Sequence, residues 1–319
     1  MSELVRWDAT PADPIENIRR IEEWVDELLG MDLVAEFAGD SSEFESLGLV
    51  AKLEALDHFA TLNWDFRAGR ERNLALEPNF TKAQSAAIDS AAARLWLDGT
   101  PTPRKKKYDS AIMTGGMVRA GIVKPRFLIE LSESGVEFGE AVFLGASRAF
   151  AGDEVALSRR LGVDGDNEID AMRTGMTQAF GLGTPTEHRS GGTGFGYWEE
   201  TEWQLGRRNF RVIAAPSSDP ALRRANTLDT FRYLAGSIDP ASKSILVVTT
   251  PVYVPYQAAM AVIAFGLEWG CCVETVAVSD SANDLGLDTQ IFGQQHKLQE
   301  LRSAIHGYRI LLGELLSGK

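Results

Sequence analysis

Glycine, hydroxyl and amide residues follow several short apolar segments of the chain, and such residues can bind a small polar ligand. Gly115 and Gly116 come directly after the apolar segment 108–114. Glycines let backbone N–H groups approach a ligand without a Cβ atom in the way, although the same pair would also suit a tight turn. No Gly-Lys-Ser/Thr follows, so the segment is not a P-loop, and it also lacks the GxGxxG dinucleotide fingerprint. Arg119, shortly after, could donate to a phosphate or carboxylate.

A second group of hydrogen-bonding residues lies in the segment 217–229. Asn226 and Thr227 stand where a helix is expected to begin, and their side chains can cap it or bind a polar ligand. Arg223 and Arg224 come just before them. Two guanidinium groups beside a helix N-terminus suit an anion about as well as they suit surface ion pairs, so both interpretations stay open.

Hydroxyl groups also gather after the apolar segment 244–250, which ends in Thr249 and Thr250 before a proline. Tyr253 and Tyr256 follow. Threonine hydroxyls can both donate to and accept from a ligand, and tyrosines can stack or donate a hydrogen bond. Packing explains one tyrosine easily, but it explains a cluster of hydroxyls less well.

A parallel sheet would bring these residues together. Short apolar segments, which we expect to be strands, alternate with helical stretches at 153–161, 167–180, 221–234 and 255–268, and the expected strands are 108–114, 141–145, 211–215, 244–250 and 272–279. This alternation predicts an α/β fold with a mostly parallel sheet of about five strands, covered by helices on both faces. Ligands bind such sheets beyond the carboxyl ends of the strands, where the residues above lie.

The first hundred residues are expected to be helical. Apolar residues recur at helical spacing in 13–30, 42–62 and 81–97. A Gly-Thr-Pro-Thr-Pro linker then marks a change of pattern, so we expect a helical subdomain over 1–103 and an α/β domain with a C-terminal helix over 104–319. A glycine-rich loop over 181–196, with His188 and Arg189, could be a mobile lid or a plain surface loop.

Composition excludes several classes of function. The chain has 44% hydrophobic and 24% charged residues, which is typical of a globular protein, and its net charge of −13 argues against a broad nucleic-acid surface. Its two cysteines, Cys271 and Cys272, are adjacent and allow neither a disulfide framework nor a metal-ligand spacing. The sequence shows no signal peptide or membrane-spanning run, which predicts a cytoplasmic protein without a membrane partner.

The order of these motifs resembles the domain-of-unknown-function-218 family, which includes YdcF-, SanA- and ElyC-like proteins. The resemblance covers about residues 108–279, and it rests on Thr114-Gly115-Gly116, Gly145-Ala146-Ser147-Arg148, Asn226-Thr227 and Thr249-Thr250-Pro251. Tyr253 and Tyr256 replace the histidine and arginine of the family pattern, and Asp229 and Thr230 replace its glutamate and asparagine. The resemblance implies a Rossmann-like three-layer sandwich with a pocket at the sheet edge and nucleotide-like or S-adenosylmethionine-like ligands.

Together these patterns predict an enzyme that binds a nucleotide-like, S-adenosylmethionine-like or phosphorylated small molecule. The sequence does not indicate which reaction it catalyses. The alternative is a noncatalytic ligand-binding or scaffolding protein whose N-terminal helices form a partner surface, and a homo-oligomer fits either. The expected catalytic residues are Asp229 as a base, Thr250 and Tyr253. The expected ligand-binding residues are Thr114, Gly115, Gly116, Arg119, Ser147, Arg148, Ser217, Asn226, Thr227, Thr249 and Tyr256.

Overall fold

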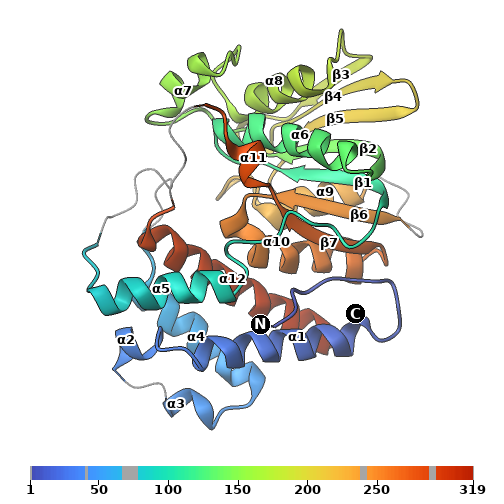
Figure 1. The fold of residues 1–319 in the computed structure, drawn as a ribbon. Helices are drawn as coiled ribbons and strands as arrows, with labels where there is room; N and C mark the ends of the chain where they lie inside the picture. The colour runs from blue at the N-terminus through green and yellow to red at the C-terminus, as the bar shows by residue number, and fades with distance from the viewer. Residues whose placement is uncertain (1, 40–41, 67–77, 238–242, 287–291, 319) are drawn as a thin grey trace.

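The computed structural model describes residues 2–39, 42–66, 78–237, 243–286 and 292–318, which form an α/β fold around a mostly parallel sheet (Figure 1). In this part of the chain the sheet has seven strands in the order β3-β4-β5-β2-β1-β6-β7. Strands β5, β2, β1, β6 and β7 are parallel, which confirms the predicted sheet, and β3 and β4 extend it antiparallel. The strands are β1 (Lys107–Thr114), β2 (Glu137–Gly145), β3 (Glu187–Gly191), β4 (Trp198–Leu205), β5 (Arg208–Ala214), β6 (Ser244–Thr249) and β7 (Cys272–Ala277).

Helices cover both faces of the sheet. Helices α6 and α8 pack on one face, and α9 and α10 pack on the other, where the N-terminal helices and α12 form a further layer (Figure 1). The helices are α1 (Asp13–Leu29), α2 (Ala35–Ala38), α3 (Ser42–Glu45), α4 (Leu49–Asn63), α5 (Lys82–Arg94), α6 (Val118–Glu133), α7 (Glu154–Arg160), α8 (Glu168–Phe180), α9 (Thr227–Ala235), α10 (Val254–Ala261), α11 (Asp280–Asn283) and α12 (Gln294–Ser317). The expected helix over 42–62 is divided into α3 and α4.

Side chains of β1 alternate between the two faces of the sheet and contribute to the hydrophobic clusters on both. In β1, Ile112 joins the hydrophobic cluster on the side of α10 and α12, whereas Ala111 and Met113 join the cluster under α6 and α8. All three side chains are fully buried. A strand buried on both faces explains the apolar run 111–113 in the second half of β1.

Helices α6 and α8 approach each other at two glycines. A Cβ atom on Gly175 would lie 1.9 Å from the backbone oxygen of Gly121, and one on Gly121 would lie 2.8 Å from the backbone of Ala171. The close crossing leaves no room for side chains at these positions. It fixes the start of α8 relative to the start of α6, and both starts face the site described below.

The C-terminal helix belongs to the helical layer. Helix α12 packs against α10 on one side and against α4, α5 and α1 on the other. Tyr308 of α12 is fully buried and meets Trp24 of α1 edge-on, with ring centroids 4.9 Å apart. The two ends of the chain therefore build one hydrophobic cluster with the α10 side of the sheet.

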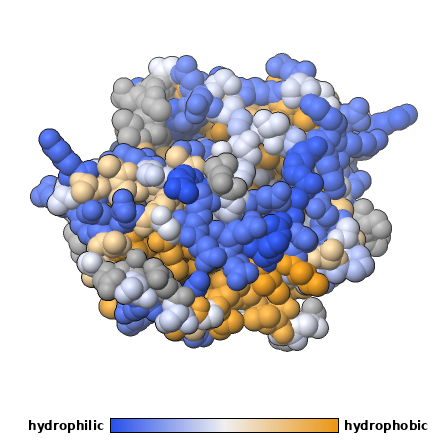
Figure 2. Space-filling view, turned by 60° about the horizontal axis from the view of Figure 1, so that its bottom comes forward, coloured by the Kyte–Doolittle hydropathy of each residue, from blue (hydrophilic) through white to orange (hydrophobic). Residues whose placement is uncertain are grey.

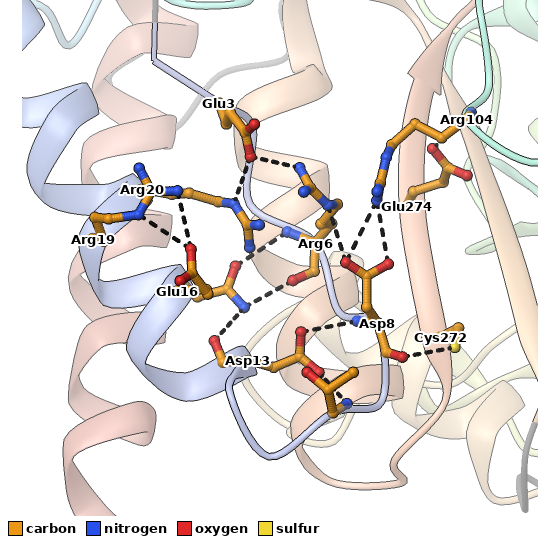
Figure 3. A network of polar contacts seen from close by, with 12 residues as sticks. Glu3, Arg6, Asp8, Asp13, Glu16, Arg19, Arg20, Arg104, Cys272 and Glu274 are labelled. Atoms are coloured by element: carbon orange, nitrogen blue, oxygen red, sulfur yellow. Dashed lines mark hydrogen bonds and ion pairs between the residues drawn. The ribbon is translucent and has the colours of Figure 1, made fainter.

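An N-terminal arm covers the edge of the sheet at β7. Trp7 forms an antiparallel bridge with Val273, and Asp8 pairs with Arg104 at 3.2 Å (Figure 3). Glu3 receives hydrogen bonds from Arg6 and Arg20. Because an open strand edge can pair with other chains, this cover limits unwanted association.

The segment 181–196, a possible lid in the sequence, contributes one strand to the sheet. Residues 187–191 form β3, in which His188 lies opposite Thr201 of β4. Arg189 pairs with Glu200 at 3.0 Å, so its side chain is held on the sheet. Sequence analysis missed this hairpin because β4 carries consecutive charged residues instead of an apolar run.

The surface of the helical layer is partly apolar. Figure 2 shows apolar residues gathered beside a broad hydrophilic area on the lower face of the molecule. Ile15 of α1 and Leu62 of α4 are 73% and 71% exposed. Among the residues that the structure describes, no helix is long and apolar enough to cross a membrane.

Candidate functional site

A cavity of about 250 Å³ opens at the carboxyl ends of β1 and β2. Helices α6 and α8 follow β1 and β2 on one face, whereas α9 and α10 follow β5 and β6 on the other. The connections therefore diverge between the neighbouring strands β1 and β6, and such a divergence leaves a crevice in parallel sheets. The turn after β1, the end of β2, the start of α9 and the start of α10 form the walls.

Half of the residues expected from the sequence line this cavity. They are Thr114, Gly115, Gly116, Arg148, Asn226, Thr227 and Tyr253. The other expected residues do not line it, and these are Arg119, Ser147, Ser217, Asp229, Thr249, Thr250 and Tyr256.

The charged groups of the cavity form one buried network centred on Arg148. Its two terminal nitrogens donate to the two carboxylate oxygens of Glu154 at 2.6 and 2.8 Å, and its Nε donates to Glu168 Oε2 at 3.3 Å. All three side chains are at most 10% exposed. Glu154 also accepts hydrogen bonds from the backbone N–H groups of Val118 and Ala151 at 3.1 and 3.0 Å. A protein carboxylate thus satisfies the first amide of α6.

Glu168 occupies the space that the glycines of the β1–α6 turn leave. Its Oε1 accepts a hydrogen bond from the Gly116 N–H at 2.6 Å. A Cβ atom on Gly115 would lie 2.3 Å from this oxygen, and one on Gly145 would lie 3.0 Å from it. The glycines do allow an anionic group to approach the backbone, but that group belongs to the chain itself. A ligand anion could reach this turn only by displacing Glu168.

Burial and charge separate the pKa values of the two glutamates. Burial raises the pKa of Glu168 above its usual value, and Arg148 and the Gly116 N–H only partly oppose this effect. Burial also acts to raise the pKa of Glu154, but the hydrogen bonds from Arg148 and from Ala151 outweigh it, so this pKa lies below its usual value. Carboxyl groups with pKa values pushed apart can divide the roles of proton carrier and fixed charge.

Beneath the cavity, Lys124 of α6 fixes the end of β1. Its ammonium group is fully buried and donates to the backbone oxygens of Thr114 and Gly115, the latter at 3.2 Å. The Thr114 hydroxyl lies 2.9 Å from this nitrogen and donates to Thr249 Oγ1 at 3.0 Å. Thr249, on the neighbouring β6, is fully buried. Thr249 was expected to bind a ligand, but its side chain instead joins the ends of β1 and β6.

A capping box begins α9 at the opposite wall. The Asn226 side chain accepts a hydrogen bond from the Asp229 N–H at 2.9 Å, and Asp229 accepts one from the Asn226 N–H at 3.0 Å. Both terminal nitrogens of Arg223 donate to the same carboxylate. Burial acts to raise the pKa of Asp229, but the hydrogen bonds from Arg223 and Ser218 outweigh it and lower the pKa below its usual value. Asp229 is therefore placed to cap a helix, and its low pKa makes it a weak base.

Gln257 of α10 brings an unsatisfied acceptor to the cavity. It is 9% exposed and lines the wall next to Tyr253. Its Nε2 donates to Thr227 Oγ1 at 3.1 Å, whereas its buried Oε1 accepts no hydrogen bond from the residues that the structure describes. Buried polar atoms are nearly always hydrogen-bonded, so this oxygen lacks a partner that a ligand can supply.

The remaining expected residues have other contacts. Arg119 donates to the side chain and backbone oxygens of Asn283 in α11, at 3.3 and 2.6 Å. Ser217 accepts a hydrogen bond from the Asp219 N–H at 3.0 Å, and Ser147 is exposed outside the cavity. Thr250 precedes the short 3-10 turn Pro251–Tyr253. None of these contacts points a side chain into the cavity.

Sequence analysis missed Glu154, Glu168 and Gln257. Glutamates in the first turn of a helix are common because they complement the helix dipole. A glutamate at such a position therefore does not by itself indicate a functional site. Gln257 follows the tyrosine cluster, in which the hydroxyl groups are the stronger sequence signal. Only the folded chain shows that Arg148 joins the two glutamates and that α10 directs Gln257 toward the cavity.

Comparison with known proteins shows similarity to mycobacterial proteins. Residues 8–96 match the family described as the Rv3785 N-terminal domain. The chain is 27% identical to "Uncharacterized protein Rv3785" of Mycobacterium tuberculosis (strain ATCC 25618 / H37Rv), over 97% of this chain and 94% of the relative. "Uncharacterized protein Mb3814" of Mycobacterium bovis has the same identity and coverage. No solved structure matches the chain.

These matches correct the family expected from the motifs. The resemblance to the domain-of-unknown-function-218 family is wrong, because the family model that matches, over residues 8–96, is that of the Rv3785 N-terminal domain, and the relatives aligned over almost the whole chain include Rv3785. The motifs misled because glycines, threonines and Asn-Thr pairs at strand ends also serve as turns and helix caps. By sequence, this chain is similar to Rv3785 of Mycobacterium tuberculosis along nearly its full length.

Proposed function

We propose that the chain is an enzyme with a Rossmann-like fold that binds an anionic small molecule in this cavity and transfers a proton through Glu168. The order of the parallel strands supports the fold: β5, β2, β1, β6 and β7 are the third, second, first, fourth and fifth of them along the chain. This is the strand order of doubly wound dinucleotide-binding domains. The observation that carries the function is the buried Glu168 carboxyl group at the cavity wall.

The size of the cavity favours a small ligand. Its volume of about 250 Å³ is below the roughly 300–1,000 Å³ that is usual for pockets holding drug-sized molecules. Among the expected ligands, a phosphorylated metabolite therefore fits better than S-adenosylmethionine or a dinucleotide. Nucleotides are still included among the compounds to be screened for binding.

The surroundings of Glu168 suit proton transfer. Arg148 donates to it, the charge of Arg224 acts on it, and Arg148 also holds Glu154 as an ionised partner. Lys124 lies near the same turn, 4.0 Å from the Cβ position of Gly116. Because burial favours the protonated form, Glu168 can release and regain a proton closer to neutral pH than an ordinary glutamate. We therefore assign to Glu168 the role of base that the sequence predicted for Asp229.

A ligand screen followed by turnover tests this proposal. Thermal shift would be measured with phosphorylated polyols, nucleotides and S-adenosylmethionine, because a ligand of the native state raises the melting temperature. Each ligand that binds would be incubated with the protein and followed by mass spectrometry. Glu168→Gln should lower turnover about 10²- to 10⁴-fold, as expected for loss of a general acid or base.

A matched control is Glu137→Gln, because Glu137 is 70% exposed at the other end of β2. This variant should keep wild-type turnover. If Glu168→Gln, folded as judged by circular dichroism, turns over a ligand as fast as the wild type does, Glu168 is not the proton-transfer group. If no compound raises the melting temperature, the cavity is not the expected binding site.

A second candidate is a scaffold that uses the helical layer to bind a partner. The apolar area beside the hydrophilic one on the lower face favours it (Figure 2). Ligand-induced stabilisation without turnover, together with a dimer in analytical ultracentrifugation, would support this candidate over the enzyme.

A further inference from the structure

Two unsatisfied groups in the cavity define what the ligand must offer. The first is the start of α9, a helix of nine residues. Asn226 satisfies the amide of Asp229 with its side chain and that of Thr230 with its backbone oxygen. The amides of Thr227 and Leu228 donate to no residue in the described part of the chain. Free amides at a helix N-terminus favour an anion, and a phosphate is a frequent occupant.

The second group is the side-chain amide of Gln257. Its Nε2 donates to Thr227 Oγ1 at 3.1 Å. The other end of the amide is then the acceptor Oε1, which is buried and unsatisfied among the described residues. Only a donor, such as a ligand hydroxyl, can satisfy it.

The position of the anion follows from the charges around the cavity. Glu168 already accepts the Gly116 N–H at the β1–α6 turn, and Glu154 accepts the first amide of α6. Two carboxyl groups on that side oppose a second anion. Arg224 and the start of α9 line the opposite wall, where positive charge and helix amides act together. An anionic group therefore belongs on the α9 side.

We infer, on the basis of the proposed function, that the ligand is a phosphorylated polyol whose phosphate lies at the start of α9 and whose hydroxyl donates to Gln257 Oε1. The same wall presents Thr230, which is 7% exposed, beside both groups. A single small molecule that carries a phosphate and a nearby hydroxyl satisfies both orphan groups at once. A phosphate ester without a hydroxyl would leave Oε1 without a partner, which weakens binding.

Isothermal titration of the full chain with three probes tests this inference. The probes are glycerol 3-phosphate, propyl phosphate, which lacks the hydroxyls, and inorganic phosphate. We expect the wild type to bind glycerol 3-phosphate at least about tenfold more tightly than propyl phosphate, since one satisfied buried acceptor contributes on that scale. In Gln257→Leu, the preference should fall to about twofold or less while the affinity for propyl phosphate stays within about twofold.

The matched control is Gln178→Leu, because Gln178 is exposed on α8 outside the cavity. This variant should keep the full preference. Equal binding of the two esters by the wild type would overturn the inference even if Gln257→Leu failed to fold, and it would leave the anion site of the proposed function standing. A preference that survives in folded Gln257→Leu would also overturn it. If none of the three probes binds while another anion raises the melting temperature, the inference fails and the proposed function stands.

Discussion

Replacing Glu154 by glutamine should destabilise the protein in a pH-dependent way. Glu154 is 1% exposed, and its two oxygens accept two hydrogen bonds from Arg148 and one each from Val118 and Ala151. A glutamine has one acceptor oxygen, so its NH₂ group would face donors that the carboxylate now satisfies. The guanidinium of Arg148 would keep its weaker bond to Glu168, at 3.3 Å, and its long bonds to the backbone oxygens of Ala149 and Gly116, at 3.3 and 3.5 Å.

The size of the expected stability loss follows from the burial of the Glu154–Arg148 ion pair. Removing one partner of a buried ion pair costs about 3–5 kcal/mol, because the other charge is left without compensation. Glutamine retains the shape and part of the hydrogen bonding, so we expect a loss near the lower end, about 3 kcal/mol at pH 7. Urea denaturation followed by circular dichroism measures it. Glu137→Gln, at an exposed position, should change stability by less than about 0.5 kcal/mol.

The stability difference between the wild type and Glu154→Gln should depend on pH in a direction that follows from the pKa of Glu154. The pKa of Glu154 is lowered in the folded state, so its carboxylate adds stability above the pKa of the unfolded chain. That stability is lost as the pH falls through the lowered pKa of the folded state. The difference between wild type and Glu154→Gln should therefore shrink toward acid pH. A loss below about 1 kcal/mol at pH 7, or a loss that stays constant while the pH falls well below the ordinary pKa of a glutamate, would refute the assignment of a buried ion pair.

Two further predictions concern packing and capping. Gly175→Ala should destabilise the protein by more than about 2 kcal/mol, because the new Cβ would meet the Gly121 oxygen, whereas Gly313→Ala, with no neighbour within 4 Å, should be neutral or stabilising by up to about 1 kcal/mol. Thermal denaturation compares them, and equal melting temperatures would contradict the close α6–α8 crossing. Asp229→Asn should cost about 1 kcal/mol or more by weakening the cap and the Arg223 pair, yet keep turnover within about threefold. A loss of turnover approaching that of the Glu168 variant would restore Asp229 as the base.

The parallel strands were predictable because burial on both faces leaves a continuous apolar run. The runs 111–113 in β1 and 245–248 in β6 have this pattern, and a helix follows each of these two strands. The antiparallel hairpin was not predictable in the same way. In β4, Glu199 and Glu200 stand together, and Glu199 pairs with Arg173 whereas Glu200 pairs with Arg189 and Arg211. These pairs stabilise a charged strand that no apolar run reveals.

The location of the site was predictable, but its contents were not. Ends of parallel strands meet at one edge, so Gly116 and Asn226 were expected near each other and both line the cavity. The sequence could not show that a glutamate 52 positions later would occupy the glycine turn. Contacts between residues so distant in the chain depend on how α8 crosses α6, and short sequence patterns do not predict that crossing.

Ligand binding in this cavity can be tested by an amide chemical-shift titration of the isotope-labelled protein with glycerol 3-phosphate. We expect the largest changes at the amides of Thr227 and Leu228, at the start of α9, together with the side-chain amide of Gln257. The Gly116 amide should change little, because its bond to Glu168 remains. Saturable changes confined to residues outside the cavity, or no saturable change at all, would contradict the claim that this cavity binds a phosphorylated small molecule.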